Sequence, residues 1–176
     1  MSIHLFYDRW PQYNKRLTDV VARMSGGQLA LRPDPTRAPL WAIVGHIAGV
    51  RVYWLCGVIG EPGAETTPFA DPGGPGWEDD EDKPRDAAEL VQALETTWRI
   101  VEGCLERWTP EMLGDTFERT KNEKRHAHSR TSILQRLFSH DAYHCGELSQ
   151  TLGIAGLPQV DLWGPDGLVR EPGQFG

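Results

Sequence analysis

The chain has 176 residues, of which 39% are hydrophobic and 24% are charged, a balance typical of a globular protein that buries one core. Its formal net charge of −7 repels phosphate backbones, so a nucleic acid is not expected as a partner. We expect a single domain over residues 1–176, in which residues 153–176 form an irregular tail.

The first predicted helix carries apolar residues three or four apart, namely Phe6, Trp10, Tyr13, Leu17, Val20, Val21 and Met24. Pro11 interrupts this pattern, so we expect the helix to kink or to begin there, and Ser25-Gly26-Gly27 to end it. A proline-rich linker over residues 32–39 leads to a second helix, residues 40–59, that is apolar almost all round. Such a helix is typical of the centre of a bundle.

Residues 38–60 are also long enough to span a bilayer. However, Arg51 would cost about 2.5–3.5 kcal/mol in the membrane, and no second spanning segment exists to shelter it. The N-terminus lacks the pattern of a secretory signal, and Cys56, Cys104 and Cys145 lie in apolar stretches without a CxxC motif. We therefore expect a cytoplasmic protein with reduced cysteines and no membrane partner.

The connection over residues 60–85 is dense in glycine, proline and acidic residues and contains the sequence WEDDED. A connection of this length indicates either a crossover along the bundle or a flap over an active site. Asp86 and Glu89 then have the spacing of a capping box, which predicts the start of a third helix. Its apolar stripe consists of Leu90, Leu94, Trp98, Val101, Leu105 and Trp108.

After a short turn at Thr109-Pro110, residues 114–130 are polar and are expected to form a loop or a hairpin, with the basic stretch 121–125 solvated. The fourth helix is predicted over residues 131–152, with Gly153 ending it. Four amphipathic helices without an alternating strand pattern predict an all-α fold, a four-helix bundle with long crossover connections.

Three histidines form the pattern with most chemical content. His140 and His144 are four residues apart on the fourth helix, so both rings project from one face at the margin of its apolar side. His46 is the only histidine of the second helix and also lies at the edge of its apolar stripe. Its neighbours are small, which is expected to leave space beside the ring (Ala42, Gly45 and Gly49).

This pattern has two interpretations. Paired histidines on a helix are often ordinary polar residues, and a single core histidine is often just hydrogen-bonded. Alternatively, three neutral imidazoles bind one divalent transition metal, such as Zn²⁺, Ni²⁺ or Fe²⁺, and leave positions open for water or substrate. His4, His126 and His128 show no comparable placement. The last two either cover the site or are solvated, and the solvated state is the one expected.

The segments WAIVGHIAGVRVYW and LFSHDAYHCGELSQ closely resemble the DinB/YfiT-like superfamily of four-helix metalloproteins. The resemblance covers most of the chain in helix order and loop proportions. In that family, one histidine of the second helix and an HxxxH pair of the fourth bind a divalent metal. The resemblance therefore implies a DinB-like domain with His46, His140 and His144 as ligands, zinc being the expected metal, and it does not imply DNA binding.

Family members include transferases that use mycothiol or bacillithiol, and a maleylpyruvate isomerase. The resemblance thus implies an enzyme that activates a thiol or water for attack on a small electrophile, as in S-transfer or hydrolysis, with a low-molecular-weight thiol as a further cofactor. The alternatives are a non-catalytic, metal-binding stress-response bundle and a carrier of a small ligand. A homodimer is also an expectation from the family.

Glu147 is a departure, because family members often carry glutamine there. It lies on the same face as His140, where it would serve as a fourth ligand, an acceptor for a ligand histidine, or a general base, or would simply be an exposed glutamate. Cys145 is expected in the core rather than as a nucleophile. Trp41, Tyr53 and Trp54 are expected in the core or along a pocket.

Overall fold

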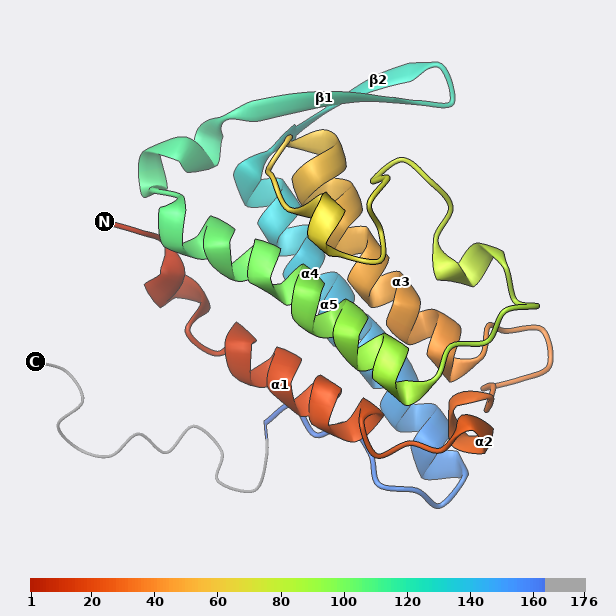
Figure 1. The fold of residues 1–176 in the computed structure, drawn as a ribbon. Helices are drawn as coiled ribbons and strands as arrows, with labels where there is room; N and C mark the ends of the chain where they lie inside the picture. Colours follow the sequence, from red (N-terminus) through yellow and green to blue (C-terminus); the bar gives the residue numbers. More distant parts are fainter. Residues whose placement is uncertain (164–176) are drawn as a thin grey trace, which may run out of the picture.

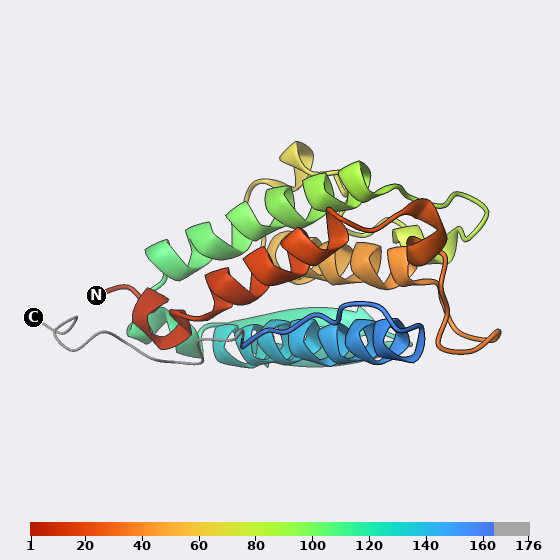
Figure 2. The same cartoon turned by 90° about the horizontal axis from the view of Figure 1, so that it is seen from below.

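The computed structural model describes residues 1–163 and shows a bundle of four long helices (Figure 1). These are α1 (Trp10–Val21), α3 (Leu40–Val52), α4 (Ala87–Arg107) and α5 (Arg130–Ile154). Helix α3 packs against both α4 and α5, and α1 lies along α4, which gives the layered arrangement seen in Figure 2. The predicted all-α four-helix bundle is confirmed.

The N-terminal segment begins with a 3₁₀ turn, His4–Tyr7, and α1 follows at Trp10 with Pro11 in its first turn. The helix thus starts at the proline, whose missing N–H costs nothing there. It already ends at Val21, so the prediction that Ser25-Gly26-Gly27 stops it is wrong. Ser25 instead caps the short helix α2 (Gly26–Leu29), because its Oγ accepts the backbone N–H of Gln28 at 3.3 Å.

The central helix continues from α3 into a π-helical stretch, η2 (Tyr53–Val58). Leu40–Val58 is long and apolar enough to cross a membrane by length and composition, but 61% of that window is buried inside the protein. A core helix of a bundle has the same composition, because it is surrounded by other helices.

The crossover between α3 and α4 runs beside α3 and contains two 3₁₀ turns, η3 (Ala64–Thr66) and η4 (Trp77–Asp79) (Figure 1). Trp77 and Phe69 pack on the two glycines of α3. A Cβ atom at Gly45 would lie 3.1 Å from Cβ of Trp77, and one at Gly49 would lie 3.3 Å from Cε1 of Phe69. Gly45 and Gly49 therefore make room for the crossover, which corrects the expectation that they leave free space beside the imidazole, whereas Ala42 borders a cavity together with His46.

Helix α4 begins with the predicted capping box, since Asp86 and Glu89 satisfy each other's backbone N–H groups. A 3₁₀ turn, η5 (Pro110–Gly114), then leads to an antiparallel hairpin of β1 (Thr116–Lys121) and β2 (Lys124–Ser129). Asn122 and Glu123 form its turn with positive φ angles of 51° and 63°. Of the two expected alternatives for this segment, a loop or a hairpin, the structure shows the hairpin.

Helix α5 runs through Gly153, so the prediction that this glycine ends the helix is wrong. The chain leaves the helix two residues after Ile154, where Gly156 has a φ of +70°, a conformation that glycine adopts without strain. Of the predicted irregular tail, Val160 is buried, and residues 164–176 lie outside the described part of the chain.

A buried polar contact joins three helices. Arg51 of α3 is fully buried and donates to Asp141 Oδ2 of α5 at 2.7 Å and to Asn14 Oδ1 of α1 at 2.8 Å. Trp10 Nε1 donates to the same Asp141 oxygen at 2.9 Å. This contact fixes the positions of α1, α3 and α5 relative to one another at the level of the predicted histidine site.

The three cysteines are all free thiols. Cys104 and Cys145 are buried, and burial raises the pKa of each to about 12. Cys56 is only half-buried, and its pKa is raised to about 11, also by burial. Cys145 therefore lies in the core as predicted and is not placed as a nucleophile.

Candidate metal centre

The structure brings the three predicted histidines together between α3 and α5. His140 Nε2 lies 3.0 Å from Nε2 of His46 and 3.1 Å from Nε2 of His144. One nitrogen of each ring lies within 4.8 Å of the others, so the three could hold a single ion. The rings are half-buried, with 32% of the His46 side chain and 15% of the His144 side chain exposed.

The far nitrogens of two rings are held by carboxylates. Nδ1 of His144 donates to Oε2 of Glu147 at 2.6 Å, and Nδ1 of His46 donates to Oε1 of Glu78. A proton held at Nδ1 leaves the lone pair of Nε2 free to bind a metal. Of the roles open to Glu147, this contact favours that of an acceptor for a ligand histidine.

Glu78 is the site residue that the sequence analysis missed. It lies on the crossover, in the 3₁₀ turn η4. The preceding residue of this turn, Trp77, packs on Gly45 of α3. The turn is fixed by a hydrogen bond from the Gly76 N–H to Asp79 Oδ2 at 2.8 Å. The acidic run WEDDED, within a segment predicted as a crossover or a flap, was the available signal, but nothing in it distinguished Glu78 from its acidic neighbours.

The three Nε2 atoms are better arranged to bind one cation than to form hydrogen bonds with one another. With Nδ1 protonated, Nε2 of His46 and of His144 is an acceptor, so a neutral His140 can satisfy one of them at most. Nδ1 of His140 is itself buried without a hydrogen-bond partner among the described residues. Nitrogen ligands of one zinc ion, each about 2.0–2.1 Å from it, lie roughly 3.3 Å apart in a tetrahedral arrangement. The separations of 3.0 and 3.1 Å from His140 are a few tenths of an ångström shorter than this.

The electrostatics of the site also suit a divalent ion. Burial, together with the neighbouring His144 and His46, lowers the pKa of His140 to about 3, and burial lowers the pKa of His144. Both rings are therefore neutral near pH 7, as ligation requires. Burial raises the pKa of Glu78, but hydrogen bonds with His46 and with a backbone N–H, together with the nearby imidazoles, outweigh burial and hold the pKa below its ordinary value. Glu78 and Glu147 thus place two negative charges beside the three imidazoles.

A cavity of about 250 Å³ opens onto this site. Pro33, Ala38, Ala42 and Ile43 give it an apolar wall, and Arg37 also lines it. His46, His144, Glu78 and Glu147 form its polar side, so a small molecule in the cavity can reach His46 and His144.

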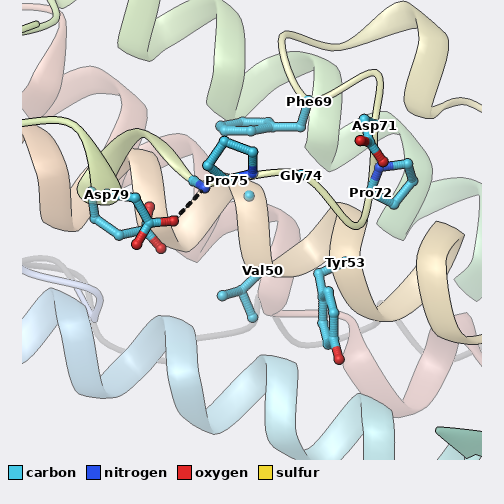
Figure 3. Close-up of a pocket in the computed structure, with 11 residues that line it drawn as sticks. Val50, Tyr53, Phe69, Asp71, Pro72, Gly74, Pro75 and Asp79 are labelled. Carbon is cyan, nitrogen blue, oxygen red and sulfur yellow. Dashed lines mark hydrogen bonds between the residues drawn. The ribbon is translucent and has the colours of Figure 1, made fainter. Parts of the chain in front are cut away.

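A second cavity of about 180 Å³ lies under the crossover (Figure 3). Val50 and Tyr53 of α3 line one side, Phe69 and Asp71 of the crossover line the other, and Glu78 belongs to the walls of both cavities. Tyr53 therefore lines a pocket, whereas Trp41 and Trp54 are buried.

The other histidines lie elsewhere. His126 and His128 are on β2, and His4 lies in the N-terminal 3₁₀ turn. His126 is exposed, as expected. His128 is not simply solvated, because its ring packs against Trp54 with the ring centroids 4.8 Å apart.

Comparison with known proteins places the chain in a family. The sequence model of the DinB superfamily matches residues 12–148. The crystal structure of a DinB-like protein from Bacillus cereus ATCC 10987 is similar with a TM-score of 0.70 and 15% identity, covering 91% of this chain and 96% of that one. This likeness shows the fold alone. No curated protein matches the chain.

Proposed function

This chain belongs to the DinB superfamily, and on that premise we propose that it is a metal-dependent enzyme that activates a thiol or water for attack on a small electrophile. The observation that carries the proposal is the convergence of three imidazole nitrogens beside a cavity. Zinc is the proposed metal, with nickel or iron as alternatives. Because the buried apolar residues of all four helices form one cluster, we also propose a single domain.

In this proposal His46, His140 and His144 hold the metal, which supplies Lewis acidity and lowers the pKa of a thiol or water bound to it. Glu78 and Glu147 orient two of the rings by holding their Nδ1 protons. Mutation of carboxylates in this position typically lowers metal affinity or activity by about 10–100-fold.

Glu78 has a second role in the proposal. Its Oε2 atom is buried and has no hydrogen-bond partner among the described residues, and its side chain reaches the cavity. In this proposal the Glu78 carboxylate accepts the proton of the thiol S–H or the water O–H as the nucleophile attacks. The proton then returns to the leaving group of the electrophile. The apolar wall around Ile43 limits competing water and accommodates the carbon skeleton of the electrophile.

The helices that carry the three histidines also support a second function. His46 comes from α3 whereas His140 and His144 come from α5, so an ion would also join two helices of the bundle. A non-catalytic, metal-binding stress-response bundle needs only this cross-link. The cavity beside the histidines favours the enzyme, because a purely structural ion needs no access for a small molecule.

Turnover separates the two functions. The zinc-loaded protein is mixed with 1-chloro-2,4-dinitrobenzene and a panel of thiols that includes glutathione, mycothiol and bacillithiol, and conjugate formation is compared with the uncatalysed rate. We expect acceleration with at least one thiol, its loss in His140→Ala and its retention in His4→Ala, which removes an exposed histidine of the N-terminal 3₁₀ turn. Stoichiometric zinc without acceleration of conjugation or of ester hydrolysis would reject the enzyme and leave the structural ion.

A further inference from the structure

Two arginines from different elements meet on one aromatic side chain at the hairpin end of the bundle. The guanidinium carbon of Arg119, on β1, lies 4.6 Å from the ring centroid of Trp54, and that of Arg136, on α5, lies 5.0 Å from it. Arg119 Nη1 also donates to the hydroxyl of Tyr53 at 2.7 Å. Stacking on the indole holds both charged groups in place without neutralising them.

Two histidines of β2 lie next to this pair of arginines. Nε of Arg119 is 3.4 Å from Nε2 of His128, and the ring of His126 stacks on that of His128. Burial lowers the pKa of His128, and the charges of Arg119 and Arg136 lower it further. Nε2 of His128 accepts the Arg119 N–H, so this ring is neutral, and the two arginines create the local positive field although the chain as a whole carries a charge of −7.

This pair lacks the counter-charge that the arginines buried between the helices and at Glu61 have. Arg51 pairs with Asp141, and both Arg107 and Arg130 pair with Glu61. Over residues 1–163, no carboxylate forms an ion pair with Arg119 or Arg136. The positive charge of both guanidiniums therefore stays available to an anion.

From this arrangement we propose that Arg119 and Arg136 form an oxyanion-binding site for the carboxylate or phosphate group of a small molecule. The planar fork of each guanidinium can donate two parallel hydrogen bonds to either group. Arg136 is exposed and Arg119 is half-buried, so the site can be reached from solvent and is at the same time anchored to the bundle.

The site lies on the same helix faces as the histidines. Arg136 precedes His140 by one turn of α5, and Tyr53 follows His46 and Val50 at the i, i+4, i+7 spacing of one α-helical face. Each turn advances about 5.4 Å. The cavity of Figure 3 has Tyr53, the hydrogen-bond partner of Arg119, and Glu78, the partner of His46, among its lining residues.

Three acidic residues line that cavity: Glu78 is bonded to His46 of α3, and the other two are engaged within their own loop. Asp71 Oδ1 accepts the N–H of Gly73 at 3.0 Å, and Asp79 Oδ2 accepts the N–H of Gly76 at 2.8 Å. If the proposed function holds, on which this step rests, the substrate is a small molecule with two ends. One end is the thiol or the electrophilic centre at the histidines, and the other is an oxyanion at the arginines.

Anion binding is tested on the full chain in a chelating buffer, so that no metal ion can bind the probe. Inorganic phosphate and acetate are titrated while the side-chain N–H signals of arginine are followed by NMR. We expect phosphate or acetate to bind with a Kd of about 1–10 mM and to shift the signals of Arg119 and Arg136. Arg136→Gln should weaken binding about tenfold or more, because it removes a charge-assisted contact.

A second variant of the site and a control variant complete the test. Arg119→Gln should weaken binding equally, but it also removes the hydrogen bond to Tyr53, so Arg136→Gln is the decisive variant. Arg125→Gln is the matched control on the same hairpin. Its side chain is 78% exposed and pairs with Glu118 at 3.3 Å, so its removal should change the affinity by less than about twofold. Failure of both anions to bind, or equal affinity in Arg136→Gln, would overturn the site.

The outcome is separable from that of the proposed function, because the titration uses metal-free protein. Anion binding at the arginines in a protein that shows no turnover supports the oxyanion site and rejects the enzyme. Turnover in a protein that binds neither phosphate nor acetate rejects the oxyanion site and leaves the enzyme.

Discussion

The carboxylate of Glu78 accepts a hydrogen bond from Nδ1 of His46, so the crossover connection positions a histidine of the central helix. The two residues are 32 positions apart in the chain. In the proposed metal site, binding would therefore depend on how the crossover packs against α3, as well as on the helices that carry the histidines.

Replacing Glu78 by glutamine should weaken zinc binding by about 10–100-fold, because the amide is a weaker acceptor for the His46 N–H. A competition titration with a chromogenic chelator measures this change. Asp82→Asn, which alters an exposed residue of the same crossover, should leave the affinity unchanged. Equal zinc affinity in Glu78→Gln and the native protein would remove Glu78 from the site.

Gly45 tests the packing that carries Glu78 to the site. A Cβ atom there lies 3.1 Å from two atoms of Trp77, so Gly45→Val should displace the crossover and weaken zinc binding, while costing about 1–3 kcal/mol of stability. Gly146→Ala is the control, because a Cβ atom at that helical glycine has no neighbour within 4 Å. It should raise stability by up to about 1 kcal/mol. Unchanged zinc affinity in Gly45→Val would show that the crossover does not position Glu78.

The buried Arg51–Asp141 pair should be sensitive to the loss of one partner. Arg51→Met leaves a carboxylate buried without its cation and should reduce the free energy of unfolding by about 3–5 kcal/mol. Adding Asp141→Leu removes that charge and should recover a large part of the loss, although Trp10 Nε1 then lacks its acceptor. Urea unfolding of both variants checks this, and a double variant no more stable than Arg51→Met would contradict it.

Glu61 should make stability depend on pH. Burial raises its pKa, but hydrogen bonds from Arg107, Trp108 and Arg130 outweigh this effect, so the pKa in the folded protein lies below the ordinary value. A lowered folded pKa stabilises the protein fully above the unfolded-state pKa, and this contribution is lost as the pH falls through the folded value. Glu61→Gln should therefore be less stable at pH 7 by about 1–3 kcal/mol.

The difference in unfolding free energy between Glu61→Gln and the native protein should shrink as the solution is acidified below the ordinary glutamate pKa. Urea titrations over a series of pH values measure it. Glu95→Gln, at an exposed position of α4, should show no such trend. A difference that stays constant into acid would mean that the charge of Glu61 does not contribute.

The sequence predicted the parts of this fold that depend on local periodicity. The apolar stripes defined the four helices, and the i, i+4 spacing placed His140 and His144 on one face. Glu78 and the Arg119–Arg136 pair could not be found in this way, because each depends on contacts between distant segments. The hairpin also lacked a signal, since its polar strands cover helix ends and show no alternation of apolar and polar residues.

The roles of three glycines also could not be predicted from the sequence. Gly45 and Gly49 suggested free space around His46, but the space is filled by Trp77 and Phe69 of the crossover. Gly153 suggested a helix end, but its backbone is helical and the left-handed residue is Gly156. In each case the residue type was correctly recognised as unusual, and the tertiary structure decided how it is used.

The central claim is that His46, His140 and His144 bind one metal ion together. The most direct measurement is an anomalous-difference map from zinc-loaded crystals, recorded on both sides of the zinc absorption edge. We predict a single strong peak about 2.0–2.1 Å from Nε2 of all three rings. A peak elsewhere, or no peak at the histidines in fully loaded crystals, would contradict the claim.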